Sequence, residues 1–284
     1  MSESIAQSQS KPGPKAKLTA MARHFTGYAK KPKLLKKICT WTATRFLTKI
    51  HHLTHRVPVT LRELEKGRVL VVAPHMDDEM IGAGGTLALH HELGSELGLV
   101  FTADCAGVGP DPAKNQAEAK VRQAEAEVAA AYFDMDYHGT LGYPCGSLSL
   151  KEKEMGRDLA KLIREWEPET IFCPFPSDHH RDHQATALGL AHALEETGWK
   201  GEVWGYEIWS TIWPNTAVDI TSVTHKKQES IECYPSQIKY MSYVESALGL
   251  NRYRGLRVLK ESAEAFYVCG AKEFQKICRH LIEL

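Results

Sequence analysis

Residues 69–86 read VLVVAPHMDDEMIGAGGT, and this stretch carries most of the information about the fold. The apolar run at 69–73 has the length and composition of a buried strand. It ends at Pro74, and His75, Asp77, Asp78 and Glu79 follow within five residues. In an α/β sheet, side chains just beyond the carboxyl end of a strand lie where such folds place their sites. One imidazole and two adjacent carboxylates could supply two metal ligands and a spare base.

A second polar stretch, PFPSDHHRDH at 174–183, also follows a short apolar run. We expect a helix to begin near Asp182, so that His180 and His183, three residues apart, face the same way on its first turn. Each stretch alone is weak evidence, because single histidines and acidic runs are common on protein surfaces. Since both stretches follow predicted strands, they predict a shared metal site of the kind found in zinc hydrolases.

Strand-like and helix-like segments alternate along the rest of the chain. The predicted strands are 69–73, 97–102, 170–173, 203–209 and 265–269, and the predicted helices are 84–94, 113–132, 151–166, 182–196 and 223–232. This alternation predicts an α/β fold with a Rossmann-like, mostly parallel sheet and helices on both faces. The glycines at 82, 84 and 85 do not match a dinucleotide-binding fingerprint, because four polar residues separate them from the strand. We interpret them as residues that let a helix approach the sheet closely.

The charge of the chain is unevenly distributed. Its 284 residues include 35 Lys or Arg and 35 Asp or Glu, yet residues 11–56 contain twelve basic residues and no acidic one. We therefore predict a basic, partly disordered arm at 1–60 and a catalytic domain at 61–284. An amphipathic helix at 34–55 would either lie on an anionic membrane surface or pack its apolar stripe on the domain. Specific nucleic-acid binding is not expected, because no reading module accompanies the charge.

The seven cysteines are scattered and include no CxxC pair, which indicates free thiols in a reducing compartment. The sequence shows neither a long apolar span nor a secretory signal. We expect a cytoplasmic protein, with peripheral binding to the inner membrane face if the basic arm contacts lipid.

PHMDDE at 74–79, taken with HRDH at 180–183, resembles the LmbE-like (PIG-L) family of zinc-dependent N-acetylglucosaminyl de-N-acetylases. The resemblance extends over about residues 66–270. Two departures stand out: Met76 replaces the proline usual in the family, and Tyr234 stands near the place where many members carry a histidine.

The resemblance implies one zinc ion per chain, with His75, Asp78 and His183 as its ligands. It implies that Asp77 is the general base of an amide hydrolysis that releases acetate and an amino sugar. Two neutral imidazoles and one carboxylate would leave zinc an open position and a net positive charge, which suits this chemistry.

The resemblance also implies roles for residues around the metal ligands and the general base. His180 would stabilise the oxyanion as an imidazolium, and Asp182 would hold it, because a neighbouring carboxylate raises the pKa of a histidine. Arg122 would bind substrate or support the site, and Glu79 would take a supporting position. The substrate implied is an N-acetylated sugar, and the basic arm would suit one that is lipid-linked.

Two alternatives stay open at the level of sequence. One is a zinc amidase that cleaves another amide, such as a thiol–sugar conjugate. The other is a non-catalytic, membrane-associated scaffold, although the intact set of polar residues argues against it. The sequence indicates neither the exact substrate nor the oligomeric state.

Overall fold

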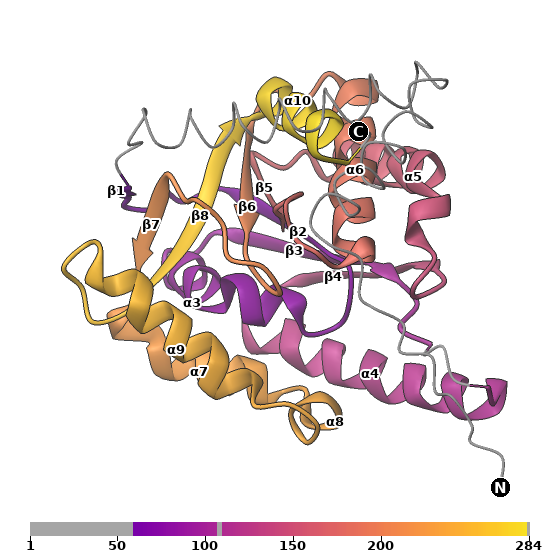
Figure 1. Cartoon of the computed structure of the whole chain (residues 1–284), viewed down its shortest axis with the longest axis horizontal. Helices are drawn as coiled ribbons and strands as arrows, with labels where there is room; N and C mark the ends of the chain where they lie inside the picture. Colours follow the sequence, from indigo (N-terminus) through magenta and orange to yellow (C-terminus); the bar gives the residue numbers. More distant parts are fainter. Residues whose placement is uncertain (1–58, 107–109, 283–284) are drawn as a thin grey trace, which may run out of the picture. The chain divides into compact units, whose positions relative to one another are not determined.

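The computed structural model describes residues 59–106 and 110–282 (Figure 1). The described residues all belong to one compact unit. The predicted amphipathic helix at 34–55 and nearly all of the basic arm lie outside the described residues. The domain boundary at residue 60 therefore stays a prediction.

Within the described residues, eight strands form one sheet in the order β1-β7-β8-β6-β5-β2-β3-β4. Neighbouring strands are parallel except that β8 runs antiparallel to both β6 and β7. The predicted mostly parallel sheet is confirmed. The strands are β1 Thr60–Leu61, β2 Arg68–Ala73, β3 Glu96–Ala103, β4 Asp136–Tyr143, β5 Thr170–Pro174, β6 Glu202–Tyr206, β7 Thr216–Asp219 and β8 Ala263–Gly270.

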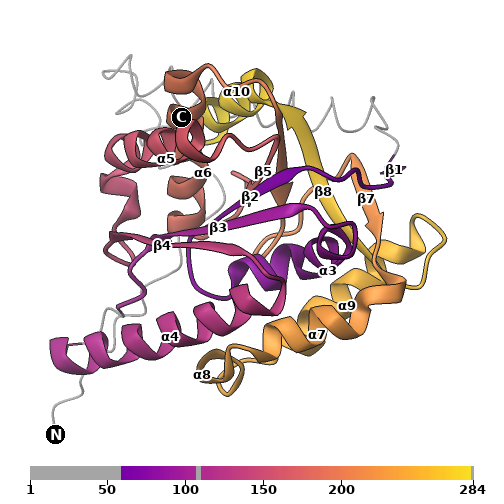
Figure 2. The ribbon, with the colours of Figure 1, turned by 180° about the vertical axis from the view of Figure 1, so that it is seen from behind.

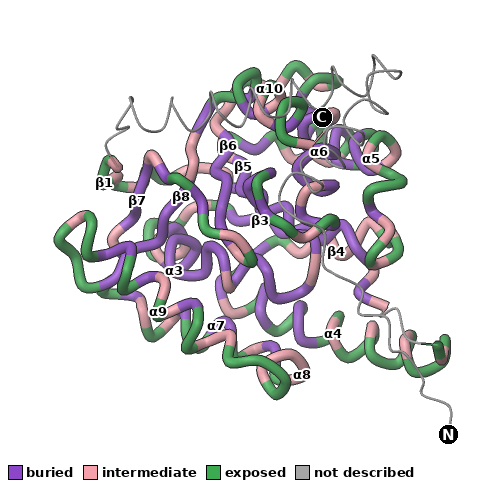
Figure 3. Tube along the Cα trace, viewed as in Figure 1, coloured by how far each residue is buried: buried purple, intermediate pink, exposed green. Residues whose placement is uncertain are grey.

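Helices cover both faces of this sheet (Figures 1 and 2). One face carries α3 Asp78–Glu92, α4 Pro112–Tyr132, α7 Thr224–Glu232, α8 Pro235–Ile238 and α9 Tyr243–Leu256. The other carries α5 Glu152–Trp166, α6 Arg181–Thr197 and α10 Ala271–Ile282. Figure 3 shows that the buried residues concentrate in the sheet and on the inner sides of α3 and α6. Strand β2 is almost wholly buried after its first residue, as expected for a central parallel strand covered on both sides.

The structure differs from the sequence prediction at several boundaries. Helix α3 begins at Asp78 rather than at residue 84, so the glycines lie inside it. A Cβ atom on Gly82 would stand 2.3 Å from the Tyr206 ring, and one on Gly85 would stand 2.8 Å from Ile220. These glycines therefore permit close packing, and that requirement overrides their low helix propensity.

The sequence pattern does not predict one strand and two helices that the structure contains. Strand β4 lies at the sheet edge, is only half-buried, and contains two glycines with positive φ, so it lacks a clear hydrophobic pattern. The helices α9 and α10 were also missed. The strand expected at 203–209 ends at Tyr206, after which the Glu207 carboxylate accepts a hydrogen bond from the Ile212 N–H (2.9 Å).

The topology places both polar stretches at one point. From β2 the chain moves outward through β3 and β4, whereas β5 lies on the other side of β2 and leads outward to β6. The crevice between the carboxyl ends of β2 and β5 is therefore the topological switch point, where ligands bind in open α/β sheets. Residues 74–78 leave β2 there, and residues 175–183 leave β5 beside them.

A buried ion pair anchors α3 over this crevice. The Lys227 ammonium lies 2.5 Å from the Glu264 carboxylate and donates to the Ile81 carbonyl (2.8 Å). The same carboxylate accepts hydrogen bonds from the N–H groups of Gly85 and Thr86 (2.9 and 2.7 Å). Strand β8 and helix α7 are thereby joined to the first turns of α3. In the described part of the chain, no helix combines the length and the apolar character needed to cross a bilayer.

Candidate metal centre and active site

His75 and Asp78 are joined by the tight turn that follows β2. The Asp78 Oδ2 atom accepts a hydrogen bond from the His75 N–H (2.9 Å) and lies 3.1 Å from His75 Nδ1. Asp78 is 2% exposed and opens helix α3, where its negative charge interacts favourably with the helix dipole. Burial alone would raise the pKa of Asp78, but the charge of His183 and the charge and hydrogen bonds of His75 hold it well below its ordinary value.

His183 approaches the same carboxylate from the first turn of α6. Its Nε2 atom lies 3.3 Å from Asp78 Oδ2, and its Nδ1 atom lies 3.4 Å from Asp178 Oδ2. The ring is fully buried, yet neither nitrogen has a hydrogen-bond partner of good geometry. An unsatisfied buried imidazole is costly, so its orientation calls for a further partner such as a metal ion.

The distances around Asp78 fit a tetrahedral metal. Ligands about 2.1 Å from zinc in that geometry stand about 3.4 Å apart, close to the separations of Asp78 Oδ2 from the two imidazoles. Each imidazole also has a carboxylate on its far side, because Asp182 Oδ2 lies 3.1 Å from His75 Nε2 and Asp178 faces His183. Carboxylates placed in this way orient metal-bound histidines in many metalloproteins. His75, Asp78 and His183 therefore fit zinc.

Two further groupings of donor atoms share His75. One nitrogen from each of His75, His180 and His183 lies within 4.8 Å of the others, and the same holds for donor atoms of His75, Cys145 and Asp182. We favour the set of His75, Asp78 and His183, because Asp78 Oδ2 lies 3.1 Å from one imidazole and 3.3 Å from the other, and each imidazole is also faced by a second carboxylate. Cys145 follows edge strand β4, so no sequence pattern connected it with the site.

Asp77 is a strained and buried acid beside these residues. Its φ of 140° lies in a region that L-residues rarely adopt, and such strain tends to concentrate at functional sites. The residue is 9% exposed, and its side chain caps no N–H group of α3. Burial and the adjacent Asp78 charge raise the pKa of Asp77 to about 8, against the opposing charges of His75 and Arg122. Such a group is poised to exchange a proton near neutral pH.

Glu79 contacts the backbone of Asp77, and Tyr234 contacts Glu79. The Asp77 N–H donates to Glu79 Oε2 (3.2 Å), and the Tyr234 hydroxyl donates to the other oxygen of that carboxylate. Burial raises the pKa of Glu79 to about 8, although the hydrogen bond from Tyr234 opposes the rise. Tyr234 is wholly buried, so the residue that departs from the family pattern is built into the support of the site.

The structure corrects the expected link between His180 and Asp182. The Asp182 carboxylate contacts His75 and accepts a hydrogen bond from the Gly146 N–H (2.7 Å), whereas His180 Nδ1 accepts one from the Asp182 N–H (3.3 Å). Burial and the charges of His183 and His75 lower the pKa of His180. The charge of Asp182 opposes this shift, as expected, and the imidazolium stays a prediction. Because Nδ1 is an acceptor, a neutral His180 ring would carry its proton on Nε2.

Arg122 and Glu125 lie one turn apart on α4. The positive charge of Arg122 opposes the rise in the pKa of Asp77. Glu125 is buried and accepts hydrogen bonds from the N–H (2.8 Å) and the hydroxyl (2.5 Å) of Ser236 at the start of α8. The charge of the arginine therefore acts on Asp77, while the glutamate anchors the segment after α7.

Asp178 is the functional residue that sequence reasoning missed. It accepts hydrogen bonds from the His180 N–H (2.8 Å) and the Trp209 N–H (3.0 Å), besides facing His183. Its position within the second polar stretch was a usable signal, although nothing in the sequence connected it with Trp209.

A histidine–carboxylate cluster at the switch point of an α/β domain is the arrangement expected of a metal-dependent hydrolase. Residues 70–194 match the family model described as PIG-L: GlcNAc-PI de-N-acetylase.

Solved structures agree with this fold. The conserved protein TT1542 from Thermus thermophilus is 27% identical, with a TM-score of 0.61 over 70% of this chain and 93% of that one. The N,N'-diacetylchitobiose deacetylase from Pyrococcus horikoshii is 23% identical, with a TM-score of 0.63 over 74% and 85% of the two chains. GalB, the 4-carboxy-2-hydroxymuconate hydratase from Pseudomonas putida, is 23% identical, with a TM-score of 0.57 over 72% and 96%.

The family match, together with the deacetylase neighbour, supports a deacetylase hydrolase. The hydratase neighbour shows that one fold carries more than one chemistry, so the activity has to be argued from the site.

Proposed function

We propose that this protein is a zinc-dependent N-deacetylase that converts an N-acetylglucosamine-containing substrate into acetate and an amino sugar. One observation carries the proposal: a strained, buried acid of raised pKa, Asp77, adjoins a carboxylate that faces the imidazoles of His75 and His183. His75, Asp78 and His183 would hold the metal. When bound there, zinc would supply Lewis acidity that acidifies water and polarises an amide carbonyl.

The chain's own groups would divide the remaining work. Asp77, ionised at the start, would take a proton from the attacking water and return it to the leaving nitrogen. The neutral His180 ring would donate its Nε2–H to the carbonyl oxygen as negative charge develops there. Arg122 would orient the substrate, and Asp182 would act as a positioning residue by holding His75.

Acetate release together with metal analysis tests this function. The purified protein is assayed with free, nucleotide-linked and lipid-linked N-acetylglucosamine and with an acylated thiol–sugar conjugate. We expect activity that a chelator removes and zinc restores. His183→Ala should lose both metal and activity, whereas the exposed neighbour His179, changed to Ala, should retain both. A metal-free wild type with full activity would refute the proposal, and release from the conjugate alone would favour the amidase alternative.

The lipid-linked form of the substrate is a finer hypothesis, and it is supported by the basic run at 11–56. Removal of residues 1–56 should reduce binding to anionic vesicles while acetate release from soluble substrates persists. Unchanged vesicle binding would remove the support for this hypothesis.

A further inference from the structure

Two cysteines lie next to each other beside the candidate metal centre, just beyond the ends of β3 and β4. The register pairs Ala103 with Tyr143, the last residues of these two strands. Cys105 and Cys145 each follow by two residues. The Asp104 N–H donates to the Tyr143 carbonyl (2.8 Å), so the pairing continues past the strand ends. Neighbouring strands stand about 4.8 Å apart, which is within the range of Cα separations that disulfides span.

The thiols of Cys105 and Cys145 are hydrogen-bond partners, so their sulfur atoms face each other. Cys105 is 1% exposed and has a φ of 53°, a left-handed conformation that is uncommon for residues with a side chain. Its sulfur accepts a hydrogen bond from the N–H of Met76 (3.4 Å), the residue that follows His75. Cys145 is half-buried, so a small oxidant would reach its sulfur before that of Cys105.

Cys145 belongs to a segment that also holds a carboxylate of the metal centre. Its sulfur, a nitrogen of His75 and a carboxylate oxygen of Asp182 lie within 4.8 Å of one another. Asp182 accepts hydrogen bonds from the N–H groups of Gly146 (2.7 Å) and Leu148 (3.4 Å). The same carboxylate lies 3.1 Å from His75 Nε2. A movement of Cys145 would therefore reach His75 through Asp182.

We propose that Cys105 and Cys145 form a reversible disulfide when a peroxide oxidises them, and that this bond weakens metal binding and lowers activity. The sequence predicts free thiols in a reducing compartment, where disulfides are typically transient and redox-sensing. The loss of activity rests on the proposed deacetylase function. The disulfide and the weaker metal binding rest on the sulfur pair and the metal cluster.

The reaction balances with hydrogen peroxide as the two-electron oxidant. The Cys145 sulfur attacks one peroxide oxygen, the O–O bond breaks, and after proton transfer the products are a sulfenic acid and water. The Cys105 sulfur then attacks the sulfur of the sulfenic acid, and the departing hydroxide takes the Cys105 proton to form a second water. The two thiols lose two electrons and two protons in total, and the peroxide is reduced to two water molecules.

Formation of the bond would displace groups of the metal centre. A disulfide brings its two sulfur atoms to about 2.05 Å, and thiols that only share a hydrogen bond stand farther apart. Either the segment that holds Asp182 or the turn after His75 therefore has to move. A displacement of about 1 Å can cost a catalytic arrangement about 10²-fold in rate.

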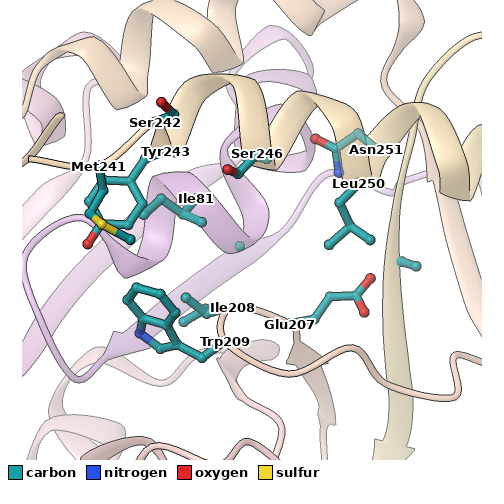
Figure 4. A pocket seen from close by; sticks show the side chains of 13 residues that line it. Ile81, Glu207, Ile208, Trp209, Met241, Ser242, Tyr243, Ser246, Leu250 and Asn251 are labelled. Carbon is teal, nitrogen blue, oxygen red and sulfur yellow. The ribbon is translucent and has the colours of Figure 1, made fainter.

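The cysteine pair is separate from the cavity that lies between α3, the segment after β6 and α9 (Figure 4). None of the residues that line this cavity is a cysteine. In the sheet, β6 lies on one side of β2, whereas β3 and β4, which lead to Cys105 and Cys145, lie on the other. Oxidation of the pair would therefore act on the metal centre and leave the cavity lining unchanged.

Peptide mapping by mass spectrometry tests the disulfide directly. The full-length, zinc-loaded protein is treated with hydrogen peroxide, its remaining thiols are alkylated, and it is digested without reductant. We expect two peptides joined through Cys105 and Cys145, which dithiothreitol separates. In Cys105→Ser the reaction should stop at a Cys145 sulfenic acid that dimedone traps, whereas Cys145→Ser should give neither product. Absence of the joined peptides from the oxidised wild type overturns the proposal.

Zinc affinity and acetate release test the consequence. Competition with a chelator should show that oxidation weakens zinc binding by about tenfold or more, and acetate release should fall by a similar factor. Dithiothreitol should restore both, and the zinc affinity of Cys145→Ser should not respond to peroxide. Cys233→Ser, at the other half-buried cysteine of the described residues, is the matched control and should respond as the wild type does.

The outcomes separate this inference from the proposed activity. A disulfide that leaves the zinc affinity unchanged, or an equal loss of affinity in peroxide-treated Cys145→Ser, overturns the inference whatever the activity. If zinc affinity falls reversibly while no probe releases acetate even from the reduced protein, the redox response is supported and only the deacetylase function fails.

Discussion

Asp77→Asn should abolish activity and yet stabilise the metal-free protein. The substitution retains the size of the side chain and removes its ability to ionise. Asp77 is buried next to Asp78, and its backbone is strained at φ 140°. A residue retained under such conditions serves catalysis at the expense of stability. Loss of a general base typically lowers the rate by about 10²–10⁴-fold.

The pKa of Asp77 gives the size of the stability change. It is about 8 in the folded protein against an ordinary value of 3.8, so the folded state binds its proton more tightly than the unfolded state. Ionisation therefore costs stability, and the cost grows as the pH rises from 3.8 to about 8. At pH 7 roughly three pKa units apply, which sets an upper limit of about 4 kcal/mol at about 1.36 kcal/mol per unit. A bound cation would reduce this cost, because it favours the carboxylate.

The assay is urea unfolding of chelator-treated protein at pH 5 and pH 8, with Asp78→Asn as the matched control. We expect Asp77→Asn to be more stable than wild type, by about 1–4 kcal/mol at pH 8 and by less at pH 5. Asp78→Asn should be less stable, because His75 and His183 hold the pKa of Asp78 below its ordinary value. A shift of both variants in the same direction, or an active Asp77→Asn enzyme, would refute this reasoning.

Three further outcomes are expected. The Asp78 charge raises the pKa of His183 to about 9 against the opposing effect of burial, so protons should compete with the metal, and zinc affinity measured by chelator titration should rise steeply from pH 6 to pH 9. Lys227→Met should lower the free energy of unfolding by about 3–5 kcal/mol, because it leaves the Glu264 carboxylate buried and unpaired. The double variant that also carries Glu264→Gln should recover part of this loss. Equal stability of the single and the double variant would contradict the prediction. Tyr234→Phe removes the hydrogen bond to Glu79, so that the pKa of Glu79 should rise further. We expect kcat to fall with little change in KM, and the acidic limb of the pH profile of kcat to move to higher pH. A pH profile that superimposes on that of the wild type would exclude a supporting role for Tyr234.

The catalytic cluster could be predicted from the sequence to a large extent, because its residues are local. His75, Asp77 and Asp78 occupy one turn, and His180 and His183 occupy another, so short motifs contain them. The partners of these residues could not be predicted in the same way. Asp182 stands near His180 in the chain, but its carboxylate contacts His75, 107 positions away in sequence. A one-dimensional pattern indicates which groups are available, whereas side-chain direction on the first turn of α6 decides which of them meet.

The limits of the fold prediction have the same cause. Strands with continuous apolar runs, such as β2 and β5, are evident because both of their faces are buried. Edge strand β4 and helix α9 bury little surface of their own, so their patterns were too weak to detect. The start of α3 was placed too late because glycine propensity is a local property, while the contact with Tyr206 that requires glycine is tertiary.

By itself, the sequence determined the α/β class, the switch-point strand and the identity of the groups that can bind metal and move a proton. Hydrophobic periodicity and motif spacing carry that information because they are properties of contiguous residues. Only the tertiary structure decided that β5 lies beside β2, that Asp178 and Asp182 face the two imidazoles, and that a cavity lies between α3, the segment after β6 and α9. These features depend on the order of the strands and on packing between distant segments, which the hydrophobic periodicity and motif spacing of contiguous residues do not encode.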